Sequence, residues 1–319
     1  MGRAGMRGMG VREKMAGMEI LVTGAGGFVG AALAPELVAR GHTVRAGTRD
    51  PGRRPAPAGA VPQRFDLDDE ASLGPALDGV ELAYYLVHSM AQKGEFARRD
   101  LHHARAFGRA ARAAGVDRVV YLSGLGDERE GLSEHLASRR AVEDALASTG
   151  PELTVLRAAI VLGRGGASFE MLVQLVRRLP VMLCPRWVET ASQPIALADT
   201  VGYLGDAAET DATRGQRLEI GGPEVLTYRE MMLRFARLEG RRRVIVTVPL
   251  FTPGLSSHWI GLVTDVPAAV ARPLAEGLRN RVVVSNGAAR RLMPRDLATF
   301  EEACRAALGL PAAPGGGSA

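Results

Sequence analysis

The chain has 319 residues, 46% of them hydrophobic and 24% charged. This length and composition are typical of a globular protein with an ample core, and they exclude a disordered chain and a small scaffold stabilised by disulfides or metals. The formal net charge is +5, yet arginines are scattered among acidic residues along most of the sequence, and no basic block with interspersed aromatic residues is present. Nucleic-acid binding is therefore not predicted.

Two cysteines, Cys184 and Cys304, lie far apart and without a C-x-x-C or His-rich neighbourhood. This pattern indicates buried thiols in a reducing compartment, with neither a disulfide framework nor a metal site. Residues 1–17 lack the apolar run of a secretion signal, so we expect a disordered leader there and a disordered tail over residues 311–319. Together these features predict a cytoplasmic protein.

Residues 244–273 contain few charges and suggest contact with a membrane. Pro249, Pro253, Asp265 and Pro267 interrupt them too often for a lipid-exposed helix. No integral membrane segment is predicted. An apolar part of a substrate-binding region is the preferred interpretation, and weak peripheral contact with a membrane is the alternative.

From Met18 to about Ile160, short β-branched runs alternate with helical stretches. This alternation predicts an α/β fold, a doubly wound parallel sheet of the Rossmann type covered by helices. The predicted elements are, in chain order, strand 19–23, helix 29–40, strand 43–46, strand 61–65, helix 72–77, strand 82–87, helix 95–114, strand 118–122, helix 134–148 and strand 153–156.

The alternation weakens beyond residue 160, where proline, tryptophan and methionine appear in an apolar, loop-rich region. We therefore assign residues 18–160 to a dinucleotide-binding domain and residues 161–191 and 210–310 to a smaller substrate-binding region. Residues 192–209 are expected to return to the first domain as one more strand and helix. The substrate pocket is expected to be lined by segments 167–183 and 251–267, with Met171, Leu175, Met182, Trp187 and Trp259 making it apolar.

The strongest local signal is ILVTGAGGFVG at Ile20 to Gly30, where an apolar strand enters a glycine-rich turn and then a helix. A pyrophosphate needs a tight turn that the ligand can approach closely, followed by a helix N-terminus whose N–H groups favour negative charge. Gly24 makes the turn, Gly27 permits the approach, and Gly30 lets helix and strand pack. The sequence therefore predicts a nicotinamide dinucleotide site that includes Thr23, Gly24, Gly27, Phe28, Val29 and Gly30.

The end of the second predicted strand, TVRAGTRD at Thr43 to Asp50, indicates which dinucleotide binds. A site for NAD usually places Asp or Glu there, because the carboxylate accepts from both ribose hydroxyls and repels a 2′-phosphate. Thr48 and Arg49 occupy the corresponding position, and a guanidinium pairs with phosphate in a bidentate manner. NADP(H) is therefore the expected cofactor, with NAD(H) as the alternative because Asp50 follows.

Several further stretches carry a family resemblance. With TGAGGFVG (23–30), they resemble the atypical short-chain dehydrogenase/reductases, and most closely the NmrA-like, NAD(P)H-binding branch related to sugar epimerases. The resemblance covers the chain from Met18 to about Leu310 and implies a Rossmann fold and cofactor binding without identifying a reaction. The stretches are FDLDD (65–69), AYYLVHSM (83–90), VVYLSGLG (119–126), LRAAIVLG (156–163), QPIALADT (193–200) and EIGGPEVLTYREMM (219–232).

The resemblance also implies roles for single residues. Ser123 matches the family's catalytic serine at the end of the fifth strand, although a serine there is also a common turn or helix cap. Arg157 falls in a segment similar to the family's L-R-P motif, with Ala158 in place of the proline, and is assigned to the cofactor site. Asp66 would accept from the adenine amino group with Leu67 against the ring, and the nicotinamide ribose would lie over Leu86, Val87 and His88.

Catalysis in this family is expected from a tyrosine and a lysine four residues later, one helical turn apart. None of the five tyrosines is followed by such a lysine, and Lys93 is the only lysine beyond residue 17. Twelve residues after Ser123, the matching positions hold His135 and Arg139. In one interpretation His135 donates a proton without a strong pKa shift, because imidazole titrates near about 6.5, and Arg139 holds ribose hydroxyls. In the other, both are surface residues of a domain that keeps the cofactor without the chemistry.

Three functions remain open from the sequence. The first is an NADP(H)-dependent oxidoreductase acting on a small or medium, apolar carbonyl-type compound. The second is a non-catalytic NADP(H)-binding redox sensor. The third is an epimerase that retains its cofactor, and because all three occur on this fold, the choice has to come from the site.

Overall fold

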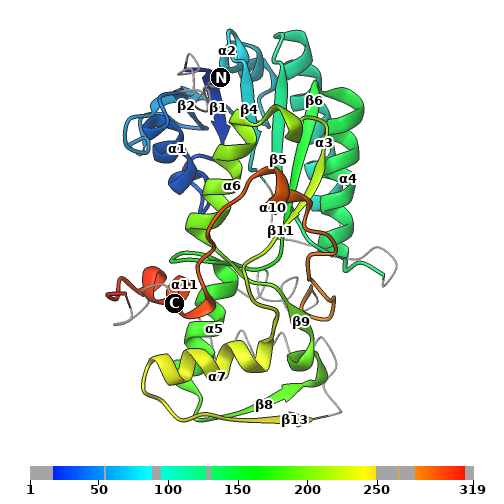
Figure 1. The fold of residues 1–319 in the computed structure, drawn as a ribbon. Coiled ribbons are helices and arrows are strands. Elements are labelled where there is room, and N and C mark those ends of the chain that lie inside the picture. Colours follow the sequence, from blue (N-terminus) through cyan, green and yellow to red (C-terminus); the bar gives the residue numbers. More distant parts are fainter. Residues whose placement is uncertain are drawn as a thin grey trace, which may run out of the picture.

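The computed structural model describes residues 17–53, 55–87, 95–126, 131–248, 265 and 277–312. A seven-stranded sheet forms the upper half of the molecule in Figure 1, with strand order β3-β2-β1-β4-β5-β6-β11 and every neighbouring pair parallel. The predicted α/β class and doubly wound parallel sheet are confirmed. The strands are β1 (Glu19–Thr23), β2 (Thr43–Thr48), β3 (Val61–Arg64), β4 (Leu82–Tyr85), β5 (Arg118–Gly124), β6 (Glu152–Ala158) and β11 (Arg217–Ile220).

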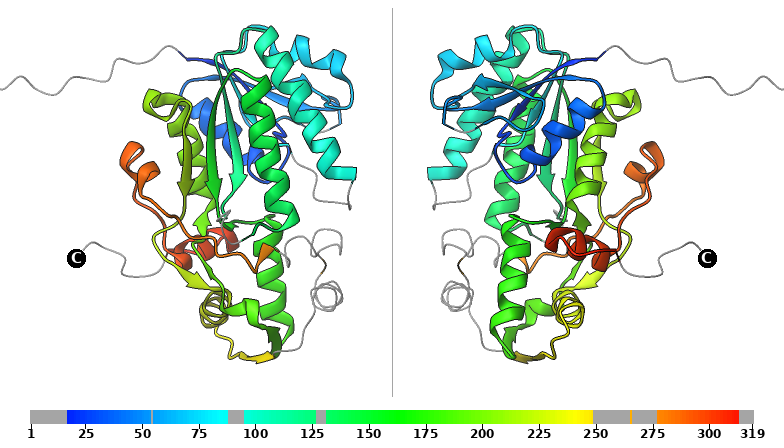
Figure 2. Two further views of the ribbon diagram at one scale, coloured as in Figure 1. Left: turned by 90° about the vertical axis from the view of Figure 1, so that its right-hand side faces the viewer. Right: turned by 90° about the vertical axis from the view of Figure 1, so that its left-hand side faces the viewer.

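Helices cover both faces of this sheet, as the side views in Figure 2 show. Ile20 and Val22 of β1 enter the core under one face, while Leu21 between them enters the core under the other. Because both of their faces are buried, the central strands β1 and β4 are almost continuously apolar. The first face packs against α1 (Gly30–Ala39), α6 (Leu197–Glu209) and α10 (Ala288–Leu292), and the second against α2 (Leu73–Leu77), α3 (Glu95–Ala113) and α4 (Glu134–Thr149).

The winding of the chain reverses between β1 and β4. Strands β2 and β3 extend the sheet on one side of β1, and β4, β5 and β6 extend it on the other. The connections that leave β1 and β4 therefore diverge and open a crevice at the carboxyl edge of the sheet, where doubly wound folds bind nucleotides. The glycine-rich turn follows β1 directly, so the fold places it at this crevice.

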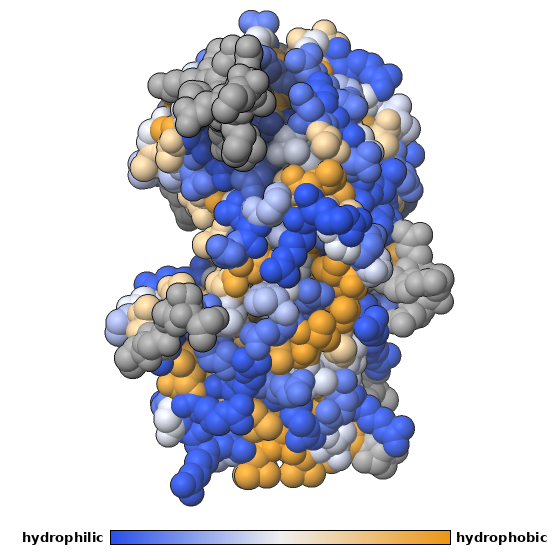
Figure 3. All heavy atoms as spheres, in the orientation of Figure 1, coloured by the Kyte–Doolittle hydropathy of each residue, from blue (hydrophilic) through white to orange (hydrophobic). Residues whose placement is uncertain are grey.

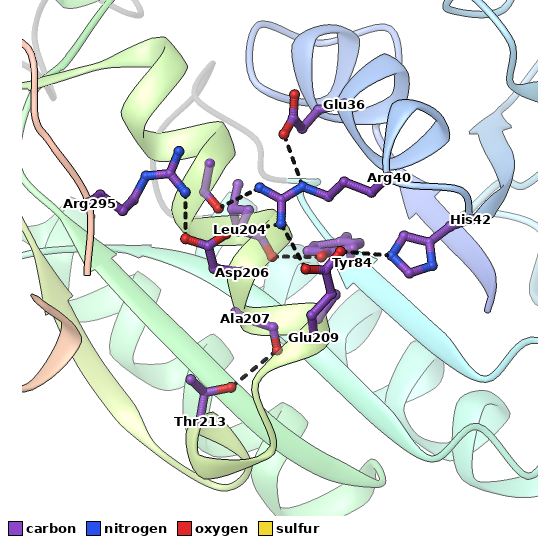
Figure 4. A network of polar contacts seen from close by, with 12 residues as sticks. Glu36, Arg40, His42, Tyr84, Leu204, Asp206, Ala207, Glu209, Thr213 and Arg295 are labelled. Carbon is purple, nitrogen blue, oxygen red and sulfur yellow. Dashed lines mark hydrogen bonds and ion pairs between the residues drawn. The ribbon is translucent and has the colours of Figure 1, made fainter. Parts of the chain in front are cut away.

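Helix α6 is fixed against α1 by a cluster of charged side chains around Arg40 (Figure 4). The Arg40 guanidinium donates to Asp206 at 3.0 Å and to Glu209 at 3.2 Å. On the sheet below, the buried Tyr84 hydroxyl donates to the Leu204 carbonyl at 2.7 Å. Residues 197–209 therefore form a helix that packs on the first domain.

A second, smaller core lies below the sheet in Figure 1 and is formed mainly by α5, α7, α11, β8 and β13. The amphipathic helices α7 and α11 both begin with a capping box, Thr227 with Glu230 and Thr299 with Glu302. The described elements of this part are β7 (Val161–Leu162), α5 (Ala167–Arg178), β8 (Val181–Pro185), β9 (Ala191–Ser192), β10 (Ile195–Ala196), β12 (Leu226–Thr227), α7 (Tyr228–Leu238), β13 (Val244–Val248) and α11 (Phe300–Leu308). Among the described residues, the 3-10 turns are η1 (Glu70–Ser72), η3 (Arg186–Glu189) and η4 (Asp211–Thr213).

Two details of the predicted domain division differ from the structure. Arg217–Ile220, which the sequence assigns to the substrate region, is β11 and pairs with β6 at the edge of the main sheet. The strand predicted within residues 192–209 is β10, and it pairs with β7 outside that sheet. Strands of two to four residues carry little periodicity, so their partners are set by tertiary packing.

Within the described residues, no helix is both long and apolar enough to cross a membrane. The same part of the chain has no group of three or more His, Cys, Asp and Glu side chains arranged to hold a metal ion. Cys184 and Cys304 are buried and free.

Candidate cofactor and substrate site

The turn between β1 and α1 is built so that only glycine fits at its key positions. Gly24 has a left-handed φ of +65°, and the N–H of Gly27 donates to the Gly24 carbonyl at 2.8 Å. A Cβ on Gly30 would lie 2.4 Å from the Gly24 oxygen, well inside van der Waals contact. Thr23 ends β1, and its Oγ1 accepts from Leu86 N at 3.0 Å, which ties the turn to β4.

The start of helix α1 fits the pyrophosphate of a dinucleotide. Val29 at the N-cap offers no side-chain cap, and the first turn carries no acidic residue. The positive end of the helix dipole is therefore left for an anionic ligand, and of the first helical N–H groups Ala31 and Ala32 already donate to the Gly27 and Val29 carbonyls. Phe28 packs its ring over Gly163 and Gly166, where a Cβ would lie within about 3.1 Å of the ring, so it joins this turn to the start of α5.

At the end of β2 the Arg49 guanidinium is available for a ligand. Arg49 is exposed and makes no hydrogen bond or ion pair with any described residue, whereas Asp50 Oδ1 accepts from Gly52 N at 3.1 Å in the following turn. Thr48 is half-buried and its carbonyl accepts from Phe65 N at 2.8 Å. This geometry favours Arg49 over Asp50 as the residue that meets the adenosine ribose.

The turn after β3 holds the residues expected at the adenine. Leu67 is buried, and Asp66 Oδ1 accepts from Asp68 N at 3.1 Å. The Asp68 carboxylate in turn binds Arg99 and, at 3.0 Å, Nε2 of His103 on α3. These contacts fix the turn against α3. Leu86 and Val87 follow β4 and line the cavity described below, and His88 lies outside the described residues.

Ser123 lies near the end of β5 and is buried, with its hydroxyl engaged by Glu143 of α4. Its Oγ donates to Glu143 Oε1 at 2.6 Å, and the same carboxylate accepts from Arg140 at 2.7 Å and from Arg157 at 2.6 Å. A hydroxyl carries a single proton, so towards the cavity Ser123 is a hydrogen-bond acceptor. Arg157, which resemblance assigns to the cofactor, pairs with Glu143 and is not among the residues that line the cavity.

His135 and Arg139 lie one turn apart on α4, and both line the cavity beside Ser123. Arg139 Nη1 donates to the Leu122 carbonyl at 3.2 Å, and its buried Nε has no partner among the described residues. Burial lowers the pKa of His135 to about 4, and the neighbouring Arg139 guanidinium adds to the effect. The expectation that His135 needs no strong pKa shift is therefore wrong, and the imidazole is neutral at pH 7.

One cavity of about 480 Å³ connects these groups. It begins at the glycine-rich turn, passes the ends of β4 and β5, and continues between α4 and the first residues of α5. Ser123, His135 and Arg139 interrupt a wall that is mainly apolar. The lining residues outside the glycine-rich turn and this polar group include Leu86, Val87, Leu125, Leu136, Ile160, Val161, Ala167, Ser168, Tyr228, Leu278 and Val282.

The predicted apolar lining is largely wrong. Met171, Leu175 and Met182 are buried in the second core, and Trp187 packs edge-on against Tyr228 with ring centroids 6.0 Å apart. Of segment 167–183, only Ala167 and Ser168 face the cavity. Trp259 and nearly all of segment 251–267 lie outside the described residues.

Known proteins match the chain over both halves. A sequence profile of the NAD(P)H-binding family matches residues 24–171. A ceramide reductase from Caulobacter vibrioides is 32% identical over 274 residues, which cover 78% of this chain and 80% of that protein. The chain belongs to the NAD(P)H-binding family of atypical short-chain dehydrogenase/reductases. The resemblance seen in the sequence motifs is thereby confirmed.

Two other known proteins resemble this family member, one in sequence and one in fold. Subunit 9 of the mitochondrial NADH dehydrogenase (ubiquinone) 1 alpha subcomplex from Arabidopsis thaliana is 27% identical over 241 residues, which cover 72% of this chain and 60% of that protein. The chain therefore spans less than two thirds of the length of that subunit. The crystal structure of Citrobacter sp. triphenylmethane reductase complexed with NADP(H) has a TM-score of 0.72 at 15% identity, covering 91% of this chain and 99% of the other. That likeness shows the shared fold.

Sequence reasoning missed two residues that shape the site of this NAD(P)H-binding family member. Glu143, 1% exposed, fixes Ser123, and Asn280 accepts from Ser133 N at 3.2 Å and donates to the Gly131 carbonyl at 2.7 Å, which anchors the start of α4 below His135. Glu143 lies eight residues after His135, on the same helix. An acidic residue two helical turns after His135, on the side of the helix that faces the sheet, could have indicated a buried partner for Ser123. Nothing in the sequence connects Asn280 with α4.

Proposed function

We propose that the chain is an NADP(H)-dependent reductase of an apolar carbonyl compound. The observation that carries the proposal is the single cavity that joins the dinucleotide turn to an apolar space, with Ser123, His135 and Arg139 in the wall between them. Pockets of this kind, mainly apolar with a few convergent polar groups, are typical of substrate sites.

The preference for NADP(H) rests on Arg49. This guanidinium is exposed at the end of β2 and makes no ion pair with any described residue, whereas the Asp50 carboxylate accepts a hydrogen bond from Gly52 N in the next turn. A 2′-phosphate would pair with such a cation. The NADP(H) complex of the Citrobacter relative supports the same choice.

Bound at the turn, the cofactor would supply a hydride to the carbonyl carbon. Arg139 offers a fixed positive charge in the cavity wall, which would stabilise the negative charge that develops on the carbonyl oxygen. His135, neutral at pH 7 because of its low pKa, would donate a hydrogen bond to the same oxygen from its ring N–H. Arginine and a neutral imidazole both keep their protons at this pH, so the product oxygen takes its proton from water.

The substrate class follows from the wall of the cavity. Leu125, Leu136, Ile160, Leu278 and Val282 offer apolar surface, and a sugar nucleotide would find few polar partners on it. Ser123 adds an acceptor that suits an amide N–H or a hydroxyl near the carbonyl. A lipid-like ketone with such a donor fits both features, and the relationship to a ceramide reductase supports it.

The test is anaerobic titration of the purified chain with NADPH, followed by single-turnover mixing with long-chain 3-oxo amides, simple ketones and a sugar nucleotide. Loss of reduced-nicotinamide absorbance is expected with the first class. Arg139→Met is expected to slow this step about a hundredfold and His135→Gln about tenfold. His102→Gln is the matched control, because the His102 side chain is 63% exposed and its ion pair within the described residues is with Glu70 at the surface. Turnover that is insensitive to Arg139→Met would overturn the proposal.

A redox sensor that binds NADP(H) without turnover is the second candidate. One observation favours it: the Ser123 proton is engaged by Glu143, and neither Arg139 nor neutral His135 releases one readily. Saturable NADPH binding with no oxidation in the presence of any carbonyl compound tested would select this function.

A further inference from the structure

The end of the molecule farthest from the Rossmann sheet carries an apolar sheet face open to solvent. Strands β8 and β13 pair in parallel there, with Val181 opposite Val244 and Leu183 opposite Val246. These four side chains are 53%, 56%, 48% and 43% exposed, and they make up four of the seven large exposed apolar side chains in the described residues. Met182 and Ile245 on the opposite face are buried in the second core. A sheet with one face in water normally places polar residues outward, so this face is unusual.

Arginines are frequent in the two chain segments that form and flank this face. Figure 3 shows an apolar area at the lower end of the molecule, where Figure 1 labels β8 and β13, with hydrophilic side chains beside it. Segments 177–189 and 237–248 contain seven arginines and only two acidic residues. The arginines are Arg177, Arg178, Arg186, Arg237, Arg241, Arg242 and Arg243, and the acidic residues are Glu189 and Glu239.

Internal ion pairs neutralise only part of this charge. Arg177 pairs with Glu239 at 2.5 Å, and Arg178 pairs with Asp265 at 2.6 Å. Arg186 and Arg242 are exposed and make no ion pair with any described residue. The fold therefore gathers an excess of positive charge around one apolar face, although arginines and acidic residues alternate along most of the sequence.

We propose that the exposed face of β8 and β13, with its arginine rim, docks on the surface of a bilayer that contains anionic lipids. Guanidinium groups bind lipid phosphates in a bidentate manner, and apolar side chains between them enter the headgroup boundary, the combination that peripheral membrane proteins use. Four half-exposed side chains offer a few hundred Å², well below the roughly 800 Å² per partner that a stable protein interface buries. The charge and the size of the face both favour a lipid surface over a second copy of the chain.

Helix α5 relates the docking face to the cavity. Gly166, Ala167 and Ser168 at its start line the cavity, and Arg177 and Arg178 in its last turn belong to the arginine rim. Twelve residues of helix span about 18 Å, so a docked chain would have its apolar cavity one helix length above the lipid. This geometry suits a protein whose apolar ligand comes from the bilayer, but the docking itself does not depend on the reductase activity.

The test is flotation of the full chain with vesicles of phosphatidylcholine alone and of an equimolar mixture of phosphatidylcholine and phosphatidylglycerol. Binding to the anionic vesicles only, weakened by added salt, is the expected result. The double variant Leu183→Ser/Val246→Ser and the double variant Arg186→Glu/Arg242→Glu should each lower the vesicle affinity about tenfold or more.

Matched controls come from equally exposed residues elsewhere in the chain. Val61 is 57% and Val225 50% exposed, so Val61→Ser/Val225→Ser should leave vesicle binding unchanged, as should Arg291→Glu at the exposed end of α10. NADPH affinity, measured in parallel, reports whether each variant is folded. The proposal is overturned if anionic vesicles are not bound, if the controls lose as much affinity as the rim and face variants, or if the face variants instead abolish a dimer.

Discussion

Ser123 on β5 and Glu143 on α4 are joined by a hydrogen bond of 2.6 Å, in which the serine hydroxyl donates to Oε1. The Glu143 side chain is 1% exposed, and Arg140 and Arg157 reach it at 2.7 and 2.6 Å. One carboxylate therefore orients the serine and also ties helix α4 to strands β5 and β6. Its removal should affect stability and the cavity together.

The substitution Glu143→Gln should lower the free energy of unfolding by about 3 kcal/mol, because the amide keeps the volume but leaves two mostly buried guanidinium groups without their counter-charge. Urea denaturation measures the change. Glu36→Gln is the control, since the Glu36 side chain is 39% exposed and its pair with Arg40 should contribute less than about 1 kcal/mol. Equal losses of unfolding free energy in the two variants would show that the buried network stabilises the fold no more than an exposed ion pair does.

The low pKa of His135 makes stability depend on pH in a defined window. Folding lowers this pKa from about 6.5 to about 4, so the unfolded chain binds the proton more tightly than the folded one. The stability that the neutral imidazole contributes to the folded state is fully present above about pH 6.5 and is lost as the pH falls towards 4. At pH 5 the loss amounts to about 2 kcal/mol relative to pH 7.

Unfolding free energies of the wild type and of His135→Gln at pH 7 and pH 5 measure this loss, because the other titrating groups cancel in the difference. His102→Gln, at a side chain that is 63% exposed, keeps His135 and should therefore lose as much stability between the two pH values as the wild type. If the wild type and His135→Gln lose the same stability between pH 7 and pH 5, the imidazole is solvated in the folded state.

The central strands of the sheet were predictable because they are buried on both faces and leave long apolar runs between helical stretches. Ile20–Val22 and Leu82–Tyr85 are such runs, and the six strands and four helices predicted up to residue 160 end within two residues of their predicted limits. Edge and connecting strands were not predictable. Arg217–Ile220 has only four residues and a charge at alternate positions, and only its pairing with β6 makes it a strand of the sheet.

The site was predictable only where chemistry is local in sequence. The turn from Thr23 to Gly30 is read directly from spacing, and the pair His135 and Arg139 was found at the positions where the family resemblance places a tyrosine and a lysine. By contrast, the pKa of His135 depends on burial, and the arginine rim depends on bringing residues 177–189 beside residues 237–248. Burial and proximity between distant segments arise from the fold, so composition along the chain did not reveal either of them.

Gly30→Ala tests whether the turn admits any side chain. Alanine in a helix usually stabilises it, but here Cβ would lie 2.4 Å from the Gly24 carbonyl oxygen, so the turn has to shift and NADPH affinity should fall at least about tenfold. Gly26→Ala is the neighbouring control, because a Cβ there meets nothing within 4 Å. Isothermal titration of both variants with NADPH gives the comparison, and tight binding by Gly30→Ala would show that the turn does not cradle the pyrophosphate.

Arg49→Ala separates the two dinucleotides. If the guanidinium meets the 2′-phosphate, its removal costs about 2 kcal/mol of NADPH binding, a loss of roughly thirtyfold in affinity. NADH lacks that phosphate, so its affinity should stay the same and serves as the internal control for the fold of the variant. Because Arg49 is exposed and makes no ion pair with the described residues, the substitution should leave the unfolding free energy within about 0.5 kcal/mol of the wild type. Equal losses of affinity for NADPH and NADH would place Arg49 against a group that both cofactors share. Unchanged affinity for both would show that Arg49 does not select the cofactor and would favour Asp50, and with it NAD(H), instead.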